Sequence, residues 1–333
     1  MSNVKKVTEN IYLINFSVYG VPDFSSACLI VGEELALIET GPTKSLPFII
    51  AGIRELGFDP ADISYIIISH IHLDHGGGAA VLLKEMPKAK VVVHEKGVRH
   101  MVEPSKLIKS SKMVFGDVLY ELYGEILPIE RGRIMPVSGG EIIDLGKNQK
   151  LKIINAPGHS NHHICIYSEK DKGLFTGEAA GVYLPDSETL IPSSPPPDFN
   201  PDIAIETIKG LSNLDLRFLM FSHSGVTEKV NRALNTAAVW LMKWKKNISE
   251  MMSKDLSVEE ITETLREDVK KVLGSNREKE LSYQWIMEQI IPACAMGYIN
   301  YFKKNNLQVF PISLKGNRIK KSTPLFKQAE KRN

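Results

Sequence analysis

Hydrophobic and polar positions alternate in short blocks through the first two thirds of the chain. Glycine, proline, aspartate and serine separate short β-rich runs, which predicts strands. A helix is expected where apolar residues recur at intervals of three and four, ending at Gly57. Residues 65–69 form a continuous apolar run, typical of a strand buried on both faces. Strands are predicted at 11–14, 27–31, 35–39, 65–69, 90–94, 151–155, 164–167, 173–176 and 218–222, and helices at 45–56, 79–84 and 202–211.

Two segments depart from this layered α/β alternation. Residues 99–134 are predicted to be a helical insertion, for which a lid over the site, a dimer surface and simple core packing are equally compatible. The region after residue 226 is predicted to be helical, with Ser257 as a helix cap and Glu260 in the capping-box position. We therefore divide the chain into a domain at 1–226, a helical C-terminal region at 227–314 and a basic, solvated tail at 315–333.

Composition narrows the class of protein. The 333 residues are 43% hydrophobic and 24% charged, which is typical of a globular protein and excludes disorder and a disulfide scaffold. A net charge of +2 offers little attraction for nucleic acid or an anionic membrane. The three cysteines are far apart among apolar residues, which indicates buried thiols in a reducing compartment. Because the N-terminal residues lack a signal-peptide core, we expect a cytoplasmic protein with no nucleic-acid or membrane partner.

The densest group of histidine and aspartate residues follows the buried strand predicted at residues 65–69. His70, His72, Asp74 and His75 stand within six positions, directly before three glycines. Extended backbone places alternate side chains on one side, and the glycine turn allows all four side chains to converge on one point. Imidazole and carboxylate are ligands that suit zinc, iron or manganese. A single histidine would be interpreted as structural, but this density favours a metal site.

Three further candidate ligands each stand just past a predicted strand. They are His159, Glu178 and His223. Layered sheets of this kind present their sites at the carboxyl ends of strands, so distant segments can contribute to one site. The alternative interpretation of Glu178 is a solvated carboxylate in a loop.

The order and spacing of these residues resemble the metallo-β-lactamase superfamily over residues 1–225. The resemblance implies an α/β fold, a four-layer αββα sandwich with the metal site at one edge, here followed by a C-terminal helical extension. It also implies two Zn²⁺ ions per chain, although Fe or Mn would suit the same donors. By this resemblance, one ion would be held by His70, His72 and His159, and the other by Asp74, His75 and His223, with Glu178 bridging them.

Two acidic residues depart from the usual family pattern, in which both positions are Asp. Glu178 stands at the bridging position, and Glu39 stands in Ile-Glu-Thr-Gly near the site. We expect the two changes to compensate each other, with Glu39 acting on a ligand rather than on the metal. The segment after His159 is similar to the corresponding segment of hydroxyacylglutathione hydrolases and lactonases. By this similarity, His163 of the present chain would support the site.

The resemblance implies a hydrolase acting on a small-molecule substrate. Hydroxide held by the two ions would attack a small ester, thioester or lactone, and Asp74 would orient it and take its proton. Tyr183 could point its hydroxyl at the substrate oxyanion, and a packing role is equally compatible. The alternatives are a mononuclear iron dioxygenase that oxidises sulfur substrates and a metallo-phosphodiesterase or nuclease, the latter disfavoured by the near-neutral charge. We also expect a homodimer.

Overall fold

The computed structural model describes residues 3–223, 225–274, 277 and 280–305. These residues fall into two units. The first runs up to Ile154 and also includes Ile166–Asp171, and the second contains Asn155–Cys165 and the described residues from Lys172 onward. The basic tail expected at 315–333 lies outside the described residues. Within the described part of the chain, no helix combines the length and the apolar character that a membrane crossing requires.

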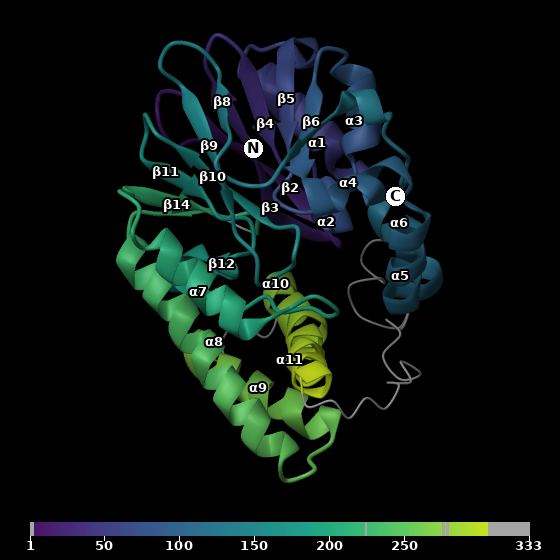
Figure 1. Cartoon of the computed structure of the whole chain (residues 1–333), viewed down its shortest axis with the longest axis vertical. Coiled ribbons are helices and arrows are strands. Elements are labelled where there is room, and N and C mark those ends of the chain that lie inside the picture. Colours follow the sequence, from purple (N-terminus) through teal and green to yellow (C-terminus); the bar gives the residue numbers. More distant parts are fainter. Residues whose placement is uncertain (1–2, 224, 275–276, 278–279, 306–333) are drawn as a thin grey trace. The chain divides into compact units, whose positions relative to one another are not determined.

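The first unit is built around a seven-stranded sheet whose strands follow one another in sequence order (Figure 1). The pairs from β1 to β4 are antiparallel, and the pairs from β4 to β7 are parallel. The carboxyl ends of the parallel strands therefore meet at one edge of this sheet. The strands are β1 (Val4–Lys6), β2 (Ile11–Val18), β3 (Val21–Val31), β4 (Leu35–Ile38), β5 (Ile63–Ile67), β6 (Lys90–His94) and β7 (Ile134–Val137).

Helices bury their apolar faces against this sheet. The helix α1 (Leu46–Glu55) packs on β2, and α4 (Glu95–Val102) packs on β6 and β7. Ile49 and Ile53 of α1 are completely buried, as their four-residue spacing predicts. Burial of such a side chain contributes about 1.5–3 kcal/mol, so the apolar face fixes the helix on the sheet. The unit also contains α3 (Ala79–Glu85), the short helix α2 (Leu73–Gly76), the antiparallel strands β8 (Ile142–Asp144) and β9 (Lys150–Asn155), and part of β10 (Ile164–Ser168).

The segment predicted as a helical insertion contains α5 (Ser105–Phe115) and α6 (Leu119–Tyr123). No residue of α5 is buried, and Met113 and Val114 are 54% and 50% exposed. The helix α6 is anchored through Leu119 and Tyr123, which form an apolar cluster with Leu73. The insertion therefore packs beside the start of α2.

Short 3-10 helices lie at Thr43–Ser45, Pro60–Asp62, Gly116–Val118, Arg131–Arg133 and Pro185–Ser187.

The second unit combines short strands with long helices. The strand β11 (Gly173–Phe175) pairs in parallel with β14 (Phe218–Met220), which pairs antiparallel with β15 (Val226–Thr227). A separate hairpin is formed by β12 (Val182–Leu184) and β13 (Thr189–Ile191). The helices are α7 (Pro201–Leu211), α8 (Val230–Met252), α9 (Val258–Leu273), α10 (Leu281–Trp285), a π-helical turn at Ile286–Ile290 and α11 (Ile291–Asn305) (Figure 1).

The C-terminal helices begin and pack as their sequence predicts. The Ser257 hydroxyl accepts from the Glu260 backbone N–H at 3.2 Å, and the Glu260 carboxylate accepts from the Ser257 N–H at 2.8 Å, which confirms the predicted capping box. The aromatic side chains of Trp244 in α8 and Tyr298 in α11 are completely buried. The Tyr298 hydroxyl donates to the Leu241 carbonyl at 3.0 Å, so it is satisfied within this core.

The three cysteines are free thiols, and all are buried. They lie in three elements, Cys28 in β3, Cys165 in β10 and Cys294 in α11. Burial raises the pKa of the Cys28 and Cys165 thiols far above the ordinary value, and it raises the pKa of Cys294 to about 12. The burial of all three cysteines agrees with what the sequence predicts.

Candidate metal centre

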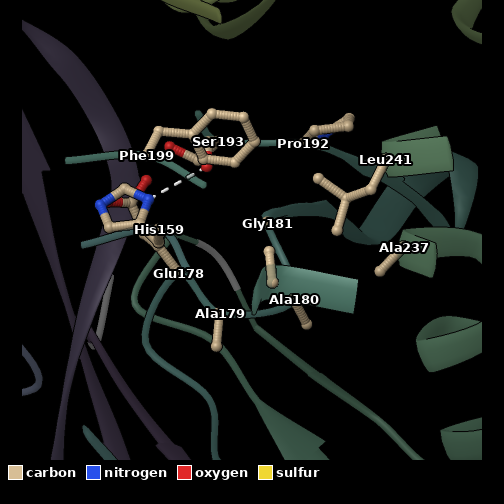
Figure 2. A pocket seen from close by; sticks show the side chains of 11 residues that line it. His159, Glu178, Ala179, Ala180, Gly181, Pro192, Ser193, Phe199, Ala237 and Leu241 are labelled. Carbon is tan, nitrogen blue, oxygen red and sulfur yellow. Dashed lines mark hydrogen bonds and ion pairs between the residues drawn. The ribbon is translucent and has the colours of Figure 1, made fainter. Parts of the chain in front are cut away.

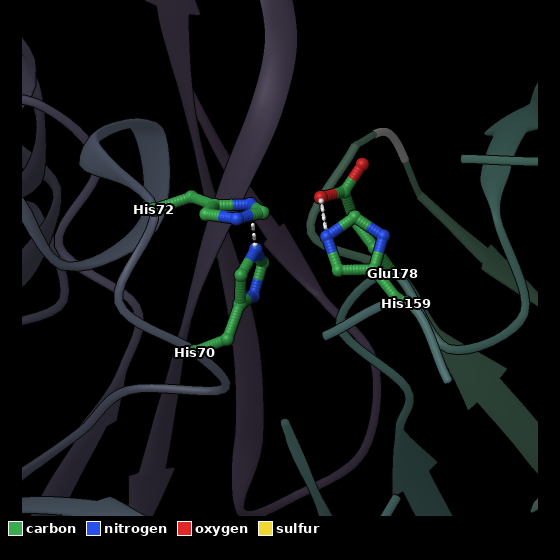
Figure 3. Close-up of side chains that lie close together, drawn as sticks. All are labelled: His70, His72, His159 and Glu178. Carbon is green, nitrogen blue, oxygen red and sulfur yellow. Dashed lines mark hydrogen bonds and ion pairs between the residues drawn. The ribbon is translucent and has the colours of Figure 1, made fainter. Parts of the chain in front are cut away.

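The first pair of candidate ligands follows the carboxyl end of β5. His70 is completely buried, and its Nδ1 lies 3.0 Å from the Ser69 hydroxyl. Its Nε2 lies 2.9 Å from the Nδ1 of His72, and the two rings face each other edge to face (Figure 3). Two ring nitrogens this close either share a proton or bind one cation, so the pair fits a metal ion.

The next two candidate ligands lie on α2, the single helical turn before the glycines. The Nε2 atom of His75 lies 3.5 Å from a carboxylate oxygen of Asp74. The His75 side chain is only 1% exposed, whereas the Asp74 side chain is 15% exposed. Asp74 is therefore the carboxylate of this cluster that a water molecule can reach.

Glu39 at the end of β4 lies on the other ring nitrogen of His75. One carboxylate oxygen is 3.3 Å from the His75 Nδ1, and the other accepts from the Ser69 N–H at 3.2 Å. The Thr40 N–H and hydroxyl both donate to the His75 carbonyl at 2.9 Å. Glu39 has a φ of 68°, which costs about 1–3 kcal/mol for a residue with a side chain, so the surrounding bonds must hold it there. Glu39 therefore contacts the candidate ligand His75 on the ring nitrogen opposite to Asp74.

The second unit places Glu178 between two histidines. Glu178 follows β11 and His223 follows β14, and because these strands are parallel their carboxyl ends lie together. One oxygen of Glu178 lies 3.1 Å from the Nε2 of His159 (Figure 3), and the other lies 3.6 Å from the Nε2 of His223. All three side chains are buried. A buried carboxylate with an imidazole at each oxygen requires compensating positive charge, which fits a cation site.

Two contacts fix the orientation of this second group. The Nδ1–H of His159 donates to the Ser193 carbonyl at 3.0 Å, which directs the Nε2 atom of the ring towards Glu178. The Nε2 atom of His163 accepts from the Glu178 backbone N–H at 3.1 Å. His163 thus supports the Glu178 backbone, in agreement with the supporting role expected from the sequence.

Tyr183 lies in β12 within a packed environment. Its ring stacks on Phe221, with the ring centroids 4.8 Å apart and an interplanar angle of 17°. Its backbone N–H donates to the His223 carbonyl at 3.3 Å. The contacts described for Tyr183 are therefore with the strand end that carries His223.

Sequence reasoning missed a tyrosine pair beside Asp74. The hydroxyls of Tyr19 and Tyr123 lie 2.9 Å apart, although the residues are 104 positions apart in the chain. Burial, the charge of Asp74 and hydrogen bonds to Tyr123 and Asp74 raise the pKa of Tyr19 well above its ordinary value. Tyr19 lies in the turn between β2 and β3, and only its position before a glycine could have drawn attention to it.

A small hollow lies beside the candidate ligands of the second unit, with a volume of about 250 Å³ including space open to solvent (Figure 2). His159 and Glu178 line it together with apolar side chains. Among these, Ala237 and Leu241 come from α8, so the C-terminal helical region contributes to the surroundings of the candidate ligands. The remaining lining residues are Ala179, Ala180, Gly181, Pro192, Ser193, Phe199 and Ala204.

The sequence match and the fold together identify the family to which this chain belongs. The family described as the metallo-beta-lactamase superfamily matches residues 20–223, more than half of the chain. The chain belongs to this superfamily and has its fold, with mixed sheets, helices and additional C-terminal helices. Both the fold class and the family resemblance expected from the sequence are thereby confirmed.

Three relatives show how the similarity is distributed. The metallo-beta-lactamase fold-containing protein ST1585 of Sulfurisphaera tokodaii is 29% identical over 211 residues, which are 62% of this chain and 74% of the relative. Its crystal structure matches with a TM-score of 0.57 over 68% of this chain and 86% of that chain. The putative diflavin flavoprotein A 2 of Nostoc is 25% identical over 49% of this chain and 24% of its own. An N-acyl homoserine lactonase of Bacillus thuringiensis is 22% identical over 53% of this chain and 62% of its own.

Proposed function

We propose that the protein is a metal-dependent hydrolase that cleaves a small ester, thioester or lactone at a site for two divalent ions. The observation that carries this proposal is the pairing of buried imidazole nitrogens and carboxylate oxygens at strand ends in both units. By the ligand pattern of the superfamily, His70, His72 and His159 would hold one ion, Asp74, His75 and His223 the other, and Glu178 would contact both. The relationship to a lactonase supports the hydrolase class.

The chain's own residues would divide the chemistry between them. Divalent ions in these positions would supply a water nucleophile near neutral pH and stabilise negative charge on the attacked carbonyl. Asp74, whose side chain is the most exposed of the candidate carboxylates, would orient the attacking water and accept its proton. The Glu39 carboxylate would hold the His75 ring from behind, and the Ser193 carbonyl would hold the His159 ring. Tyr183 remains a proposed contact for the substrate oxyanion.

The test is metal content per chain, measured by plasma mass spectrometry, for the wild type and for Glu178→Ala. The matched control is Glu169→Ala, which removes an exposed glutamate of the same region. We expect about two ions per chain in the wild type and in the control, and fewer in Glu178→Ala. Hydrolysis of a panel of esters, thioesters and lactones should follow the metal content. Equal metal content in all three proteins would contradict the role of Glu178.

The second candidate function is an oxidoreductase. The similarity to a diflavin flavoprotein favours it, although this chain spans only 24% of that relative's length. Histidine and carboxylate ligands also suit iron. Protein that contains iron, hydrolyses no member of the panel and consumes oxygen with a reductant would place this candidate first.

Three finer properties belong to the same proposal. We propose zinc as the native metal, a cytoplasmic location and a homodimer. The metal analysis identifies the ion, and sedimentation velocity at several protein concentrations measures the oligomeric state. A single species with the mass of one chain at all concentrations would exclude the homodimer.

A further inference from the structure

One face of α11 lies along the segment of residues 192–197. The Cys294 thiol donates to the Pro192 carbonyl at a sulfur–oxygen distance of 3.2 Å. Further along the helix, the Lys304 ammonium donates to the Pro197 carbonyl at 2.6 Å, and the Asn300 amide lies 3.5 Å from the same oxygen. Together with Gly297, these positions recur at intervals of three and four residues, which places them on one side of the helix. The helix therefore binds backbone carbonyls at both ends of the segment.

Gly297 lies at the centre of the same helix face and makes the closest approach. A Cβ atom at this position would lie 1.7 Å from the Ser194 carbonyl oxygen and 2.8 Å from the Ser194 carbonyl carbon. These are backbone atoms, which cannot rotate away as a side chain could. Any residue other than glycine at position 297 must therefore push the helix and the segment apart.

The segment that α11 contacts carries the hydrogen-bond acceptor of a candidate metal ligand. Ser193 lies between Pro192 and Ser194, and its carbonyl accepts from the Nδ1–H of His159 at 3.0 Å. At the far end, Phe199 packs edge to face on Tyr298 of α11, with ring centroids 4.8 Å apart. The position of the Ser193 carbonyl is thus set from both sides by contacts with one helix.

We propose that α11 is a positioning element for His159, acting through the backbone of residues 192–197. The inference rests on the proposed metal function of His159 and adds a role for the C-terminal helical region. The contact with Ser193 selects the ring tautomer and the orientation that present Nε2 to a metal ion. Cys294, Gly297 and Lys304 are accordingly positioning residues, and none of them is a proposed metal ligand.

The test compares Gly297→Ala with the wild type by titrating metal-free protein with Zn²⁺ in competition with a chromogenic chelator. We expect the affinity for one ion to fall about 10- to 100-fold, as is typical when the partner of a metal-bound histidine is lost. The affinity for the other ion should stay within about twofold, because the ligands proposed for it do not include His159, whose ring the Ser193 carbonyl orients. The matched control is Gly210→Ala in α7, where a Cβ atom meets nothing within 4 Å.

A milder pair of variants covers the case in which Gly297→Ala does not fold. Cys294→Ala removes the donor to Pro192, whereas Cys294→Ser retains a donor. We expect about fivefold weaker Zn²⁺ binding for Cys294→Ala and recovery to within about twofold for Cys294→Ser. The imidazole region of the ¹⁵N NMR spectrum should show a change in the His159 resonances of Cys294→Ala.

The outcomes separate this inference from the proposed function. If the wild type binds two ions and the folded Gly297→Ala and Cys294→Ala proteins bind both ions equally well, the positioning role of α11 is wrong and the metal function stands. If the wild type binds no metal ion, both fail. A drop in thermal stability with unchanged affinity would assign α11 to stability alone and overturn the inference.

Discussion

Each of the two glutamates at the candidate centre holds a histidine through a buried carboxylate. Glu39 contacts the Nδ1 of His75, whereas Glu178 contacts the Nε2 atoms of His159 and His223. Each has one methylene more than aspartate, so each can reach a ring from a strand end. Both glutamates could be singled out in the sequence, because each stands at the end of a strand that an apolar run predicts.

We predict that Glu39→Gln weakens the binding of one metal ion about 10-fold. The amide preserves the shape but removes the negative charge that polarises the His75 ring. Competition titration with Zn²⁺ measures the effect, and Glu85→Gln on the exposed end of α3 is the control. Binding that matches the wild type would show that the contact between Glu39 and His75 is structural only.

The contact between Tyr19 and Tyr123 is a feature at the scale of residues that could not be predicted from the sequence. The candidate metal ligands are dense in the sequence and stand after predicted strands, so they could be proposed from the sequence alone. Tyr19 and Tyr123 meet only because α6 packs beside α2, and neither residue has a neighbouring motif. A contact over 104 positions between two ordinary tyrosines carries no local signal.

At the scale of elements, the sequence predicted the strands that carry a clear apolar run, including the three-residue β11 and β14, but it missed other strands of two or three residues. The β2, β5 and β6 strands and the α1 and α7 helices lie close to the predicted ranges. The β12 and β13 hairpin and the β15 strand were missed, because two or three residues cannot show a period of two. Their existence depends on backbone pairing with partners that the sequence does not identify.

The α7, α8 and α11 helices are joined by Asp202, which gives a pH-dependent stability. Hydrogen bonds from Lys245 and Tyr301 hold the pKa of the Asp202 carboxyl below its ordinary value of 3.8. A lowered pKa in the folded state stabilises the protein above the ordinary value, and this contribution is lost as the pH falls through the lowered pKa.

We therefore predict that Asp202→Asn lowers the melting temperature at pH 7 and that the difference from the wild type disappears below about pH 3. The carboxylate is half exposed, so the loss at pH 7 should be at most about 1 kcal/mol. Thermal unfolding followed by circular dichroism from pH 2.5 to 7 measures both quantities. A difference that stays constant with pH would mean that Asp202 acts through packing rather than charge.

At the scale of the whole molecule, the candidate ligands bring carboxylates and imidazoles together in buried positions. A divalent ion at the candidate centre would add positive charge beside the buried Glu178 carboxylate and would stabilise the folded state. We predict that chelation lowers the melting temperature and that added Zn²⁺ restores it, by about 2.7 kcal/mol at a free concentration 100 times the dissociation constant. Differential scanning calorimetry with and without chelator measures the change. Identical transitions would contradict metal binding by the folded protein.

The three buried thiols can also serve as natural reporters of local opening of the structure. A thiol with a pKa far above neutral reacts with an alkylating reagent only when its surroundings open to solvent and the thiolate can form. Cys28 and Cys165 lie within strands, and Cys294 lies on the α11 face that contacts residues 192–197. The order in which the three thiols become labelled under native conditions would therefore rank how readily these elements open. No probe would need to be added to the chain.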